Sequence, residues 1–175
     1  MFKKQLTHFF QPNAANEQFR HHGPVVSFIF FFLIFCESGC QTIPTLPKVN
    51  LSEPGWSIRQ GQAVWRTGRD APEIAGELIV ATNPDGRSFL QFTKTPLPFV
   101  VAQSTANSWQ IEFVPENKTY SGRGNPPKRL IWLYLPRCLA GALPPKPWSW
   151  QRLENDGWRL ESQTTGESLE GFLNP

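Results

Sequence analysis

Apolar and polar residues alternate along much of the chain after residue 55, as expected for strands with one buried and one wet face. The alternation is clearest at 108–114, where Trp109, Ile111 and Phe113 fall on one side and Gln110 and Glu112 on the other. The same pattern predicts further strands at 56–66, 77–82, 87–94, 99–104, 117–120, 148–153, 158–161 and near 169–172. Short strands in this order favour an antiparallel sheet that is covered on one face only.

Turn residues divide these runs at two places. Asn83-Pro84-Asp85-Gly86 joins the runs 77–82 and 87–94, and proline presets the first turn dihedral while glycine supplies a positive φ. Asn155-Asp156-Gly157 stands between 148–153 and 158–161 in the same way. Both positions predict turns between neighbouring antiparallel strands.

One stretch departs from the strand pattern. Asn125-Pro126-Pro127 is typical of a helix start, with asparagine as the cap and proline in the first turn. The apolar run 128–135 is then predicted to be helical until Pro136 breaks or kinks it, and a second helical turn is expected from there to Gly141. The expected fold class is therefore α+β, a curved antiparallel sheet with short helices on its concave side.

The first 40 residues differ from the rest. An apolar run of 12 residues, 25–36, follows the basic residues Lys3, Lys4 and Arg20 and precedes Ser38-Gly39-Cys40. A helix that spans a bilayer needs about 20 apolar residues, so an uncleaved membrane anchor is a weaker interpretation of this run than a cleaved signal. A buried helix of the folded domain is a weaker interpretation still, because the run is apolar on every side. The order basic, apolar, small-small-Cys is typical of an export signal and resembles a bacterial lipoprotein cleavage site.

This interpretation sets the expected organisation of the chain. Residues 1–39 are a signal peptide, 40–54 are the lipidated Cys40 and a proline-rich tether, and 55–175 are one folded domain. Removing the leader leaves 136 residues, which suffices for a single domain with its own core.

Charge and histidine content exclude several function classes. The whole chain carries a formal net charge of +3 and the leader +1, which leaves +2 on the mature part, too little to indicate nucleic-acid binding. All three histidines, His8, His21 and His22, lie in the leader, so the mature part lacks the commonest general base and the commonest metal ligand. We expect no enzyme activity, no metal and no cofactor.

The cysteine and acidic residues also favour a protein without enzyme activity. Cys138 is the single cysteine left after Cys36 and Cys40, so no disulfide framework is expected, and its apolar neighbours predict a buried, inert thiol. A carboxylate pair for glycoside hydrolysis is the enzymatic alternative, but solvated carboxylates are the ordinary interpretation of acids at turns and on a wet strand face. The acids concerned are Asp70, Glu73, Glu77, Glu112, Glu154 and Asp156.

Two further features each leave two interpretations open. All seven tryptophans follow residue 55, either as core packing or as the lining of an apolar ligand cavity. Basic residues gather in one stretch, either as a solvated face or as a contact with anionic lipid or an acidic partner. They are Arg123, Lys128, Arg129 and Arg137.

Three short motifs carry a family resemblance. Leu135-Pro136 followed by Gly141-x-x-Pro144, and then 156–160 (Asp-Gly-Trp-Arg-Leu), resemble the outer-membrane lipoprotein receptor LolB, and 92–101 is similar to the sheet centre of the related periplasmic carrier LolA. The similarity spans about 61–160 in order and spacing. It implies an incomplete antiparallel barrel, with short helices plugging its concave side over an apolar cavity.

The resemblance also implies a function. The domain would receive the acyl chains of a lipoprotein from a periplasmic carrier, while a lipid such as palmitate on Cys40 holds it at the outer membrane, facing the periplasm. Leu97 is the nearest candidate for an exposed loop residue that touches the membrane, and an ordinary turn leucine is its alternative. A structural or interaction lipoprotein of the same fold without a ligand is the competing function. The residues expected to line the cavity are Phe92, Val101, Ile111, Phe113, Leu130, Leu133 and Trp158.

Overall fold

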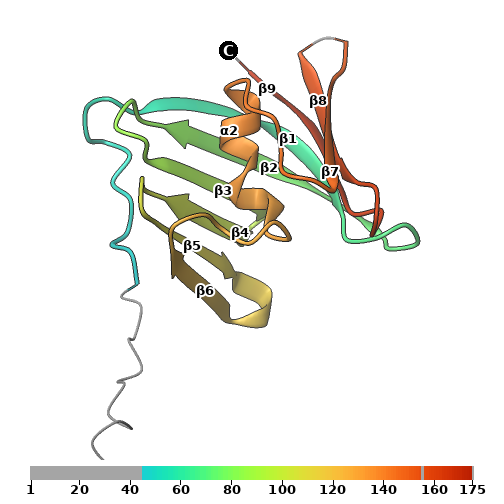
Figure 1. Ribbon diagram of the computed structural model, residues 1–175, viewed down its shortest axis with the longest axis horizontal. Helices are drawn as coiled ribbons and strands as arrows, with labels where there is room; N and C mark the ends of the chain where they lie inside the picture. Colours follow the sequence, from blue (N-terminus) through green and yellow to red (C-terminus); the bar gives the residue numbers. More distant parts are fainter. Residues whose placement is uncertain (1–44, 155, 175) are drawn as a thin grey trace, which may run out of the picture. The chain divides into compact units, whose positions relative to one another are not determined.

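The computed structural model describes residues 45–154 and 156–174, and nine strands in these ranges form one antiparallel sheet (Figure 1). The spatial order is β6-β5-β4-β3-β2-β1-β9-β8-β7, so β6 and β7 are the two edges and the sheet does not close. The strands are β1 (Ser57–Arg66), β2 (Glu73–Thr82), β3 (Ser88–Lys94), β4 (Leu97–Ser104), β5 (Ser108–Phe113), β6 (Lys118–Arg123), β7 (Trp148–Arg152), β8 (Gly157–Ser162) and β9 (Ser168–Leu173).

The expected strands are all present, and the β2–β3 hairpin is confirmed in detail. Thr82 pairs with Ser88, and the amide of Asn83 donates to the carbonyl of Arg87 over 2.9 Å. Gly86 has φ +90°, a conformation that side chains with a Cβ rarely adopt, so the glycine of this turn is required by its geometry.

The helical content is smaller than the sequence predicts. The described helical segments are η2 (Val114–Glu116), η3 (Ile131–Leu133) and α2 (Leu135–Leu139). The prediction of a helix over 128–135, capped by Asn125, is wrong, since Leu130 precedes η3 without any side-chain cap. Helix propensity does not account for this, because Leu, Lys and Arg supply five of the eight residues. The helix is interrupted at Leu130, whose ψ of 70° is not helical, and only one 3₁₀ turn follows it. The second predicted turn is confirmed as α2, with Pro136 in its first turn and Gly141 at φ +98° behind it.

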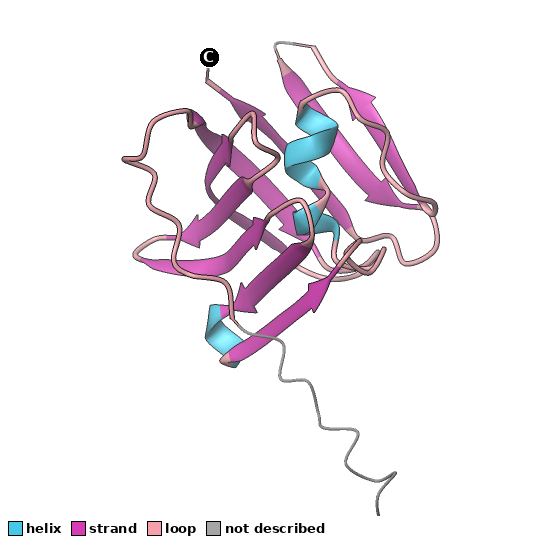
Figure 2. Cartoon of the chain, turned by 60° about the vertical axis from the view of Figure 1, so that its left-hand side comes forward, coloured by secondary structure: helices cyan, strands magenta, loops and turns pink. Residues whose placement is uncertain are grey.

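The η3 and α2 segments lie against one face of the sheet, which we call the inner face (Figure 2). They pack on β2, β3 and β4, and their buried side chains join the core that the inner face forms. The other face, the outer face, carries mostly polar side chains such as Gln91 and Gln103, as the period of two predicts.

The first and last described strands meet in the middle of the sheet. Strand β1 pairs with β2 on one side and with β9 on the other, with Gly61 opposite Leu173. Gly61 fits there because a Cβ at this position would stand 2.0 Å from the carbonyl oxygen of Phe172. The nine described strands and the core cluster of the described residues lie between residues 57 and 173, so residues 41–175 contain the sheet together with its core.

Candidate functional site

The residues predicted to line a cavity gather on the inner face. Five of the seven belong to the buried core cluster, and Phe113 is half-buried against it. Val101 does not face this cluster, because its neighbours Val100 and Ala102 are buried there and side chains alternate along a strand. The five core members are Phe92, Ile111, Leu130, Leu133 and Trp158.

Trp132, which the sequence did not single out, fills the centre of the inner face. Its ring lies 5.2 Å from that of Phe92 and 5.3 Å from that of Trp65, centroid to centroid, the latter edge to face. It comes from η3 and is 1% exposed. We call residues 130–139, which carry Trp132 and pack on β2, β3 and β4 at the inner face, the plug.

Buried indole N–H groups on the inner face lack partners. The Nε1 atoms of Trp109, Trp132 and Trp158 are buried and have no hydrogen-bond acceptor among the described residues. An unpaired buried donor costs about 1–3 kcal/mol, because the bond to water is lost and not replaced. The inner face thus buries its apolar side chains, but three of its indole N–H groups have no hydrogen-bond acceptor among the described residues.

Two other tryptophans have their N–H groups satisfied at the margin of the plug. Trp148 of β7 donates to the carbonyl oxygen of Lys128 over 2.8 Å, which ties the chain before the plug to an edge strand. Trp65 donates to the carboxylate of Glu167 over 3.1 Å. Burial raises the pKa of Glu167, and the hydrogen bond from Trp65 offsets part of that rise.

Cys138 lies on the inward side of α2, which confirms the predicted buried thiol. It is 1% exposed and free, and burial raises its pKa to about 11. The thiolate is the reactive form, so this cysteine reacts slowly in the native state. Cys40, the proposed lipid attachment site, lies outside the described residues.

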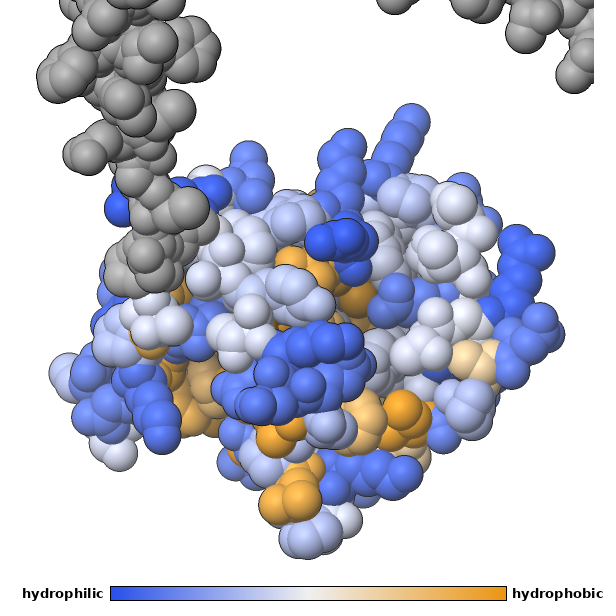
Figure 3. Space-filling view, turned by 90° about the horizontal axis from the view of Figure 1, so that it is seen from below, coloured by the Kyte–Doolittle hydropathy of each residue, from blue (hydrophilic) through white to orange (hydrophobic). Residues whose placement is uncertain are grey.

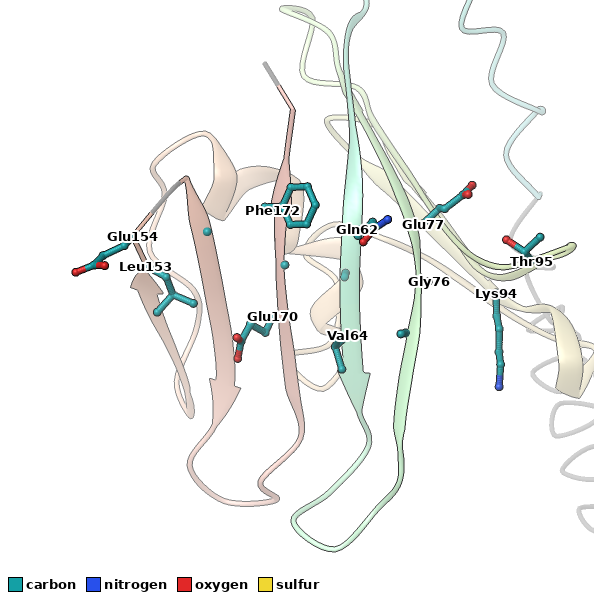
Figure 4. Close-up of a pocket in the computed structure, with 14 residues that line it drawn as sticks. Gln62, Val64, Gly76, Glu77, Lys94, Thr95, Leu153, Glu154, Glu170 and Phe172 are labelled. Atoms are coloured by element: carbon teal, nitrogen blue, oxygen red, sulfur yellow. The ribbon is translucent and has the colours of Figure 1, made fainter.

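An open groove of about 900 Å³ lies on the outer face (Figure 4). It runs over β1, β2 and β9, and Glu77, Glu154 and Glu170 stand at its walls. None of the seven predicted cavity residues lines it. A smaller pocket of about 260 Å³ includes Trp158 together with Leu139 and Trp150.

Basic and apolar side chains reach the surface around the plug. All four predicted basic residues are exposed, and none forms an ion pair with another described residue. Leu97 is 67% exposed at the β3–β4 turn, whereas Leu143, which the sequence analysis missed, is 88% exposed after α2. Figure 3 shows apolar side chains that reach the surface between long hydrophilic ones.

The fold and the site define an open antiparallel sheet with one short, largely buried segment packed on β2, β3 and β4. No protein-family model matches the sequence, and no curated protein is significantly similar to it. Among the described residues, none of the helices has the length and apolar character needed to cross a bilayer.

Proposed function

We propose that this protein is a lipid-anchored, non-enzymatic binder of acyl chains at the outer membrane, similar in role to the LolB receptor. In this proposal the sheet acts as an incomplete barrel, the plug closes its concave side, and the acyl chains enter between them. Lipoproteins delivered by a periplasmic carrier would supply those chains. Cys40 would carry the anchor.

The plug supports this proposal more than any other feature. It is short, it contains one turn of 3₁₀ helix and five residues of α-helix, and its central side chain leaves a buried N–H unpaired. A lipid ester or carboxyl oxygen between plug and sheet would accept from Trp132, and its chain would take over the apolar contacts. Exposure of one CH₂ to water costs about 0.8 kcal/mol, so acyl chains need such a covered site in transit.

In the closed arrangement the inner face is filled, and ligand entry therefore requires the plug to move. Cys138 reports that movement, because it is the single cysteine of residues 41–175 and is buried on the inward side of α2. The rate at which a thiol reagent labels Cys138 measures how often the plug lifts from the sheet.

The test uses residues 41–175 with and without a brominated fatty acid. The expected results are quenching of tryptophan fluorescence by the bromine atoms and faster labelling of Cys138. Trp132→Phe should lose part of the quenching, whereas Trp56→Phe, outside the core cluster, should keep it. Absence of quenching together with an unchanged labelling rate would refute ligand binding on the inner face.

The anchor is tested separately in cells. Metabolic labelling with radioactive palmitate should mark the natural chain and should not mark Cys40→Ala. Label that persists in the variant would refute lipidation at Cys40 without bearing on the inner face.

A structural or interaction lipoprotein without a ligand is the second candidate. The dense packing around Trp132 favours it, since that core holds the tryptophan between Phe92 and Trp65. Native mass spectrometry of the domain purified from cells separates the two functions. Lipid that co-purifies supports the binder, and its reproducible absence supports the module.

A further inference from the structure

Charges are segregated along this chain. Residues 123–146, which we call the cationic segment, contain five basic residues and no acid, whereas all fourteen acids of the chain lie elsewhere. Each of the five is exposed, and none forms an ion pair with a described residue. They are Arg123, Lys128, Arg129, Arg137 and Lys146.

The cationic segment is amphipathic because it contains the plug. Its inward side chains, such as Ile131, Trp132 and Cys138, are buried against the sheet. Its basic side chains point away, since they cannot enter that apolar core without a partner. The positive charge of Lys128, Arg129 and Arg137 therefore lies on the solvent side of the plug. Arg123 differs, because its neighbour Gly122 in β6 faces Trp109 on the inner face, which places Arg123 on the outer face.

Two hydrogen bonds to backbone carbonyls hold the cationic segment together. The bond from Trp148 to the carbonyl of Lys128 places the residues before η3 beside the start of β7, next to Lys146. The amide of Ala142 donates to the carbonyl of Arg137 over 2.9 Å, which fixes the loop after α2 to the helix. The loop 141–147 thus stays close to the basic residues on both sides.

Leu143 projects from this loop. At 88% exposure it is the most exposed large apolar residue among those described. Pro144 and Pro145 follow it and restrict the loop, so the leucine is not free to fold back. A lone exposed leucine is ordinary, but here it stands among basic residues that have no acid to pair with.

We propose that the cationic segment, with Leu143 at its tip, docks on an anionic lipid surface. Exposed basic side chains near such a surface each contribute about 1 kcal/mol, and an apolar side chain adds insertion into the headgroup region. The long, separate cations offer charge without a fixed pocket or an aromatic anchor, which suits a fluid lipid surface better than a folded acidic protein. The proposal does not depend on acyl-chain binding at the inner face.

The test measures how residues 41–175 partition onto vesicles at low and physiological salt. One vesicle type is phosphatidylcholine alone, and the other is equal parts of phosphatidylcholine and phosphatidylglycerol. The domain should bind the second type only, and less at higher salt. Lys128→Gln with Arg129→Gln should weaken binding about fivefold per removed charge, and Leu143→Ser about tenfold.

Matched controls separate this site from general effects. Lys48→Gln with Lys94→Gln removes two exposed charges outside the cationic segment, and Ile58→Ser removes an exposed apolar side chain of β1. Both should leave binding unchanged, and circular dichroism should show that every variant is folded. The proposal is overturned by equal binding to both vesicle types, or by controls that lose as much as the test variants. Binding to polyglutamate but to neither vesicle type would also overturn it and would identify an acidic protein partner.

Discussion

The unpaired N–H of Trp132 makes a quantitative prediction about two tryptophans. Trp132→Phe removes a buried donor that has no acceptor, whereas Trp148→Phe removes a donor bonded to Lys128 and leaves that carbonyl oxygen without its partner. Both indoles are at most 7% exposed, so each substitution also leaves a small cavity, which lowers the free energy of unfolding. In Trp132→Phe that loss is offset, because removing an unsatisfied group recovers about 1–3 kcal/mol.

We therefore expect Trp148→Phe to lower the free energy of unfolding by about 1–2 kcal/mol more than Trp132→Phe does. Urea unfolding of residues 41–175, followed by far-ultraviolet circular dichroism, measures the difference without relying on tryptophan fluorescence. Equal slopes of the two transitions would show that the comparison is sound. If Trp132→Phe is as destabilising as Trp148→Phe or more so, the indole N–H of Trp132 has a partner in solution and the reasoning fails.

Two further predictions concern single side chains. Burial raises the pKa of Glu167, so the native state binds the proton of this carboxyl more tightly than the unfolded state does. The protonated group therefore stabilises the fold at low pH, and this contribution is lost as pH rises through the raised pKa. Glu167→Gln should remove this part of the pH dependence, as measured by urea midpoints across the range. Equal pH profiles of the two proteins would contradict it. A Cβ at Gly122 would lie 2.4 Å from the ring of Trp109, so Gly122→Ala should cost about 1–3 kcal/mol of stability in the same assay. Gly68→Ala, whose Cβ would have no neighbour closer than 3.7 Å, is its control, and equal losses would refute the clash.

Much of the sheet could be predicted from the sequence because its signals are local. The alternation around Ile111 and the turn at Gly86 each depend on a few adjacent residues, and the structure has the corresponding strand and hairpin. The strand ends were less predictable. For example, β2 begins at Glu73 rather than Glu77, since its first residues are ordered by pairing with Arg66 and other residues of β1 rather than by their own pattern.

The first half of the plug, with its central residue Trp132, could not be predicted in the same way. The apolar stretch around Trp132 lacks a clear period, and its conformation is set by the sheet beneath it rather than by helix propensity. The predicted cavity residues were identified as inward-facing, but a sequence does not state which side chain fills the space between two elements. Val101 was misplaced because a strand position next to buried residues is easily assigned to the wrong face.

The pairing of β1 with β9 bears on how the chain reaches its native state. The sheet is continuous through a pair of strands from opposite ends of the domain, and so its central contacts span a large sequence separation. Such non-local pairing is slow, because loop-closure entropy is lost before the contacts form. A nascent chain that ends before Ser168 would leave β1 and β8 as two exposed edges, each able to pair with another molecule. Truncation near the carboxyl end should therefore cause aggregation rather than a smaller folded domain.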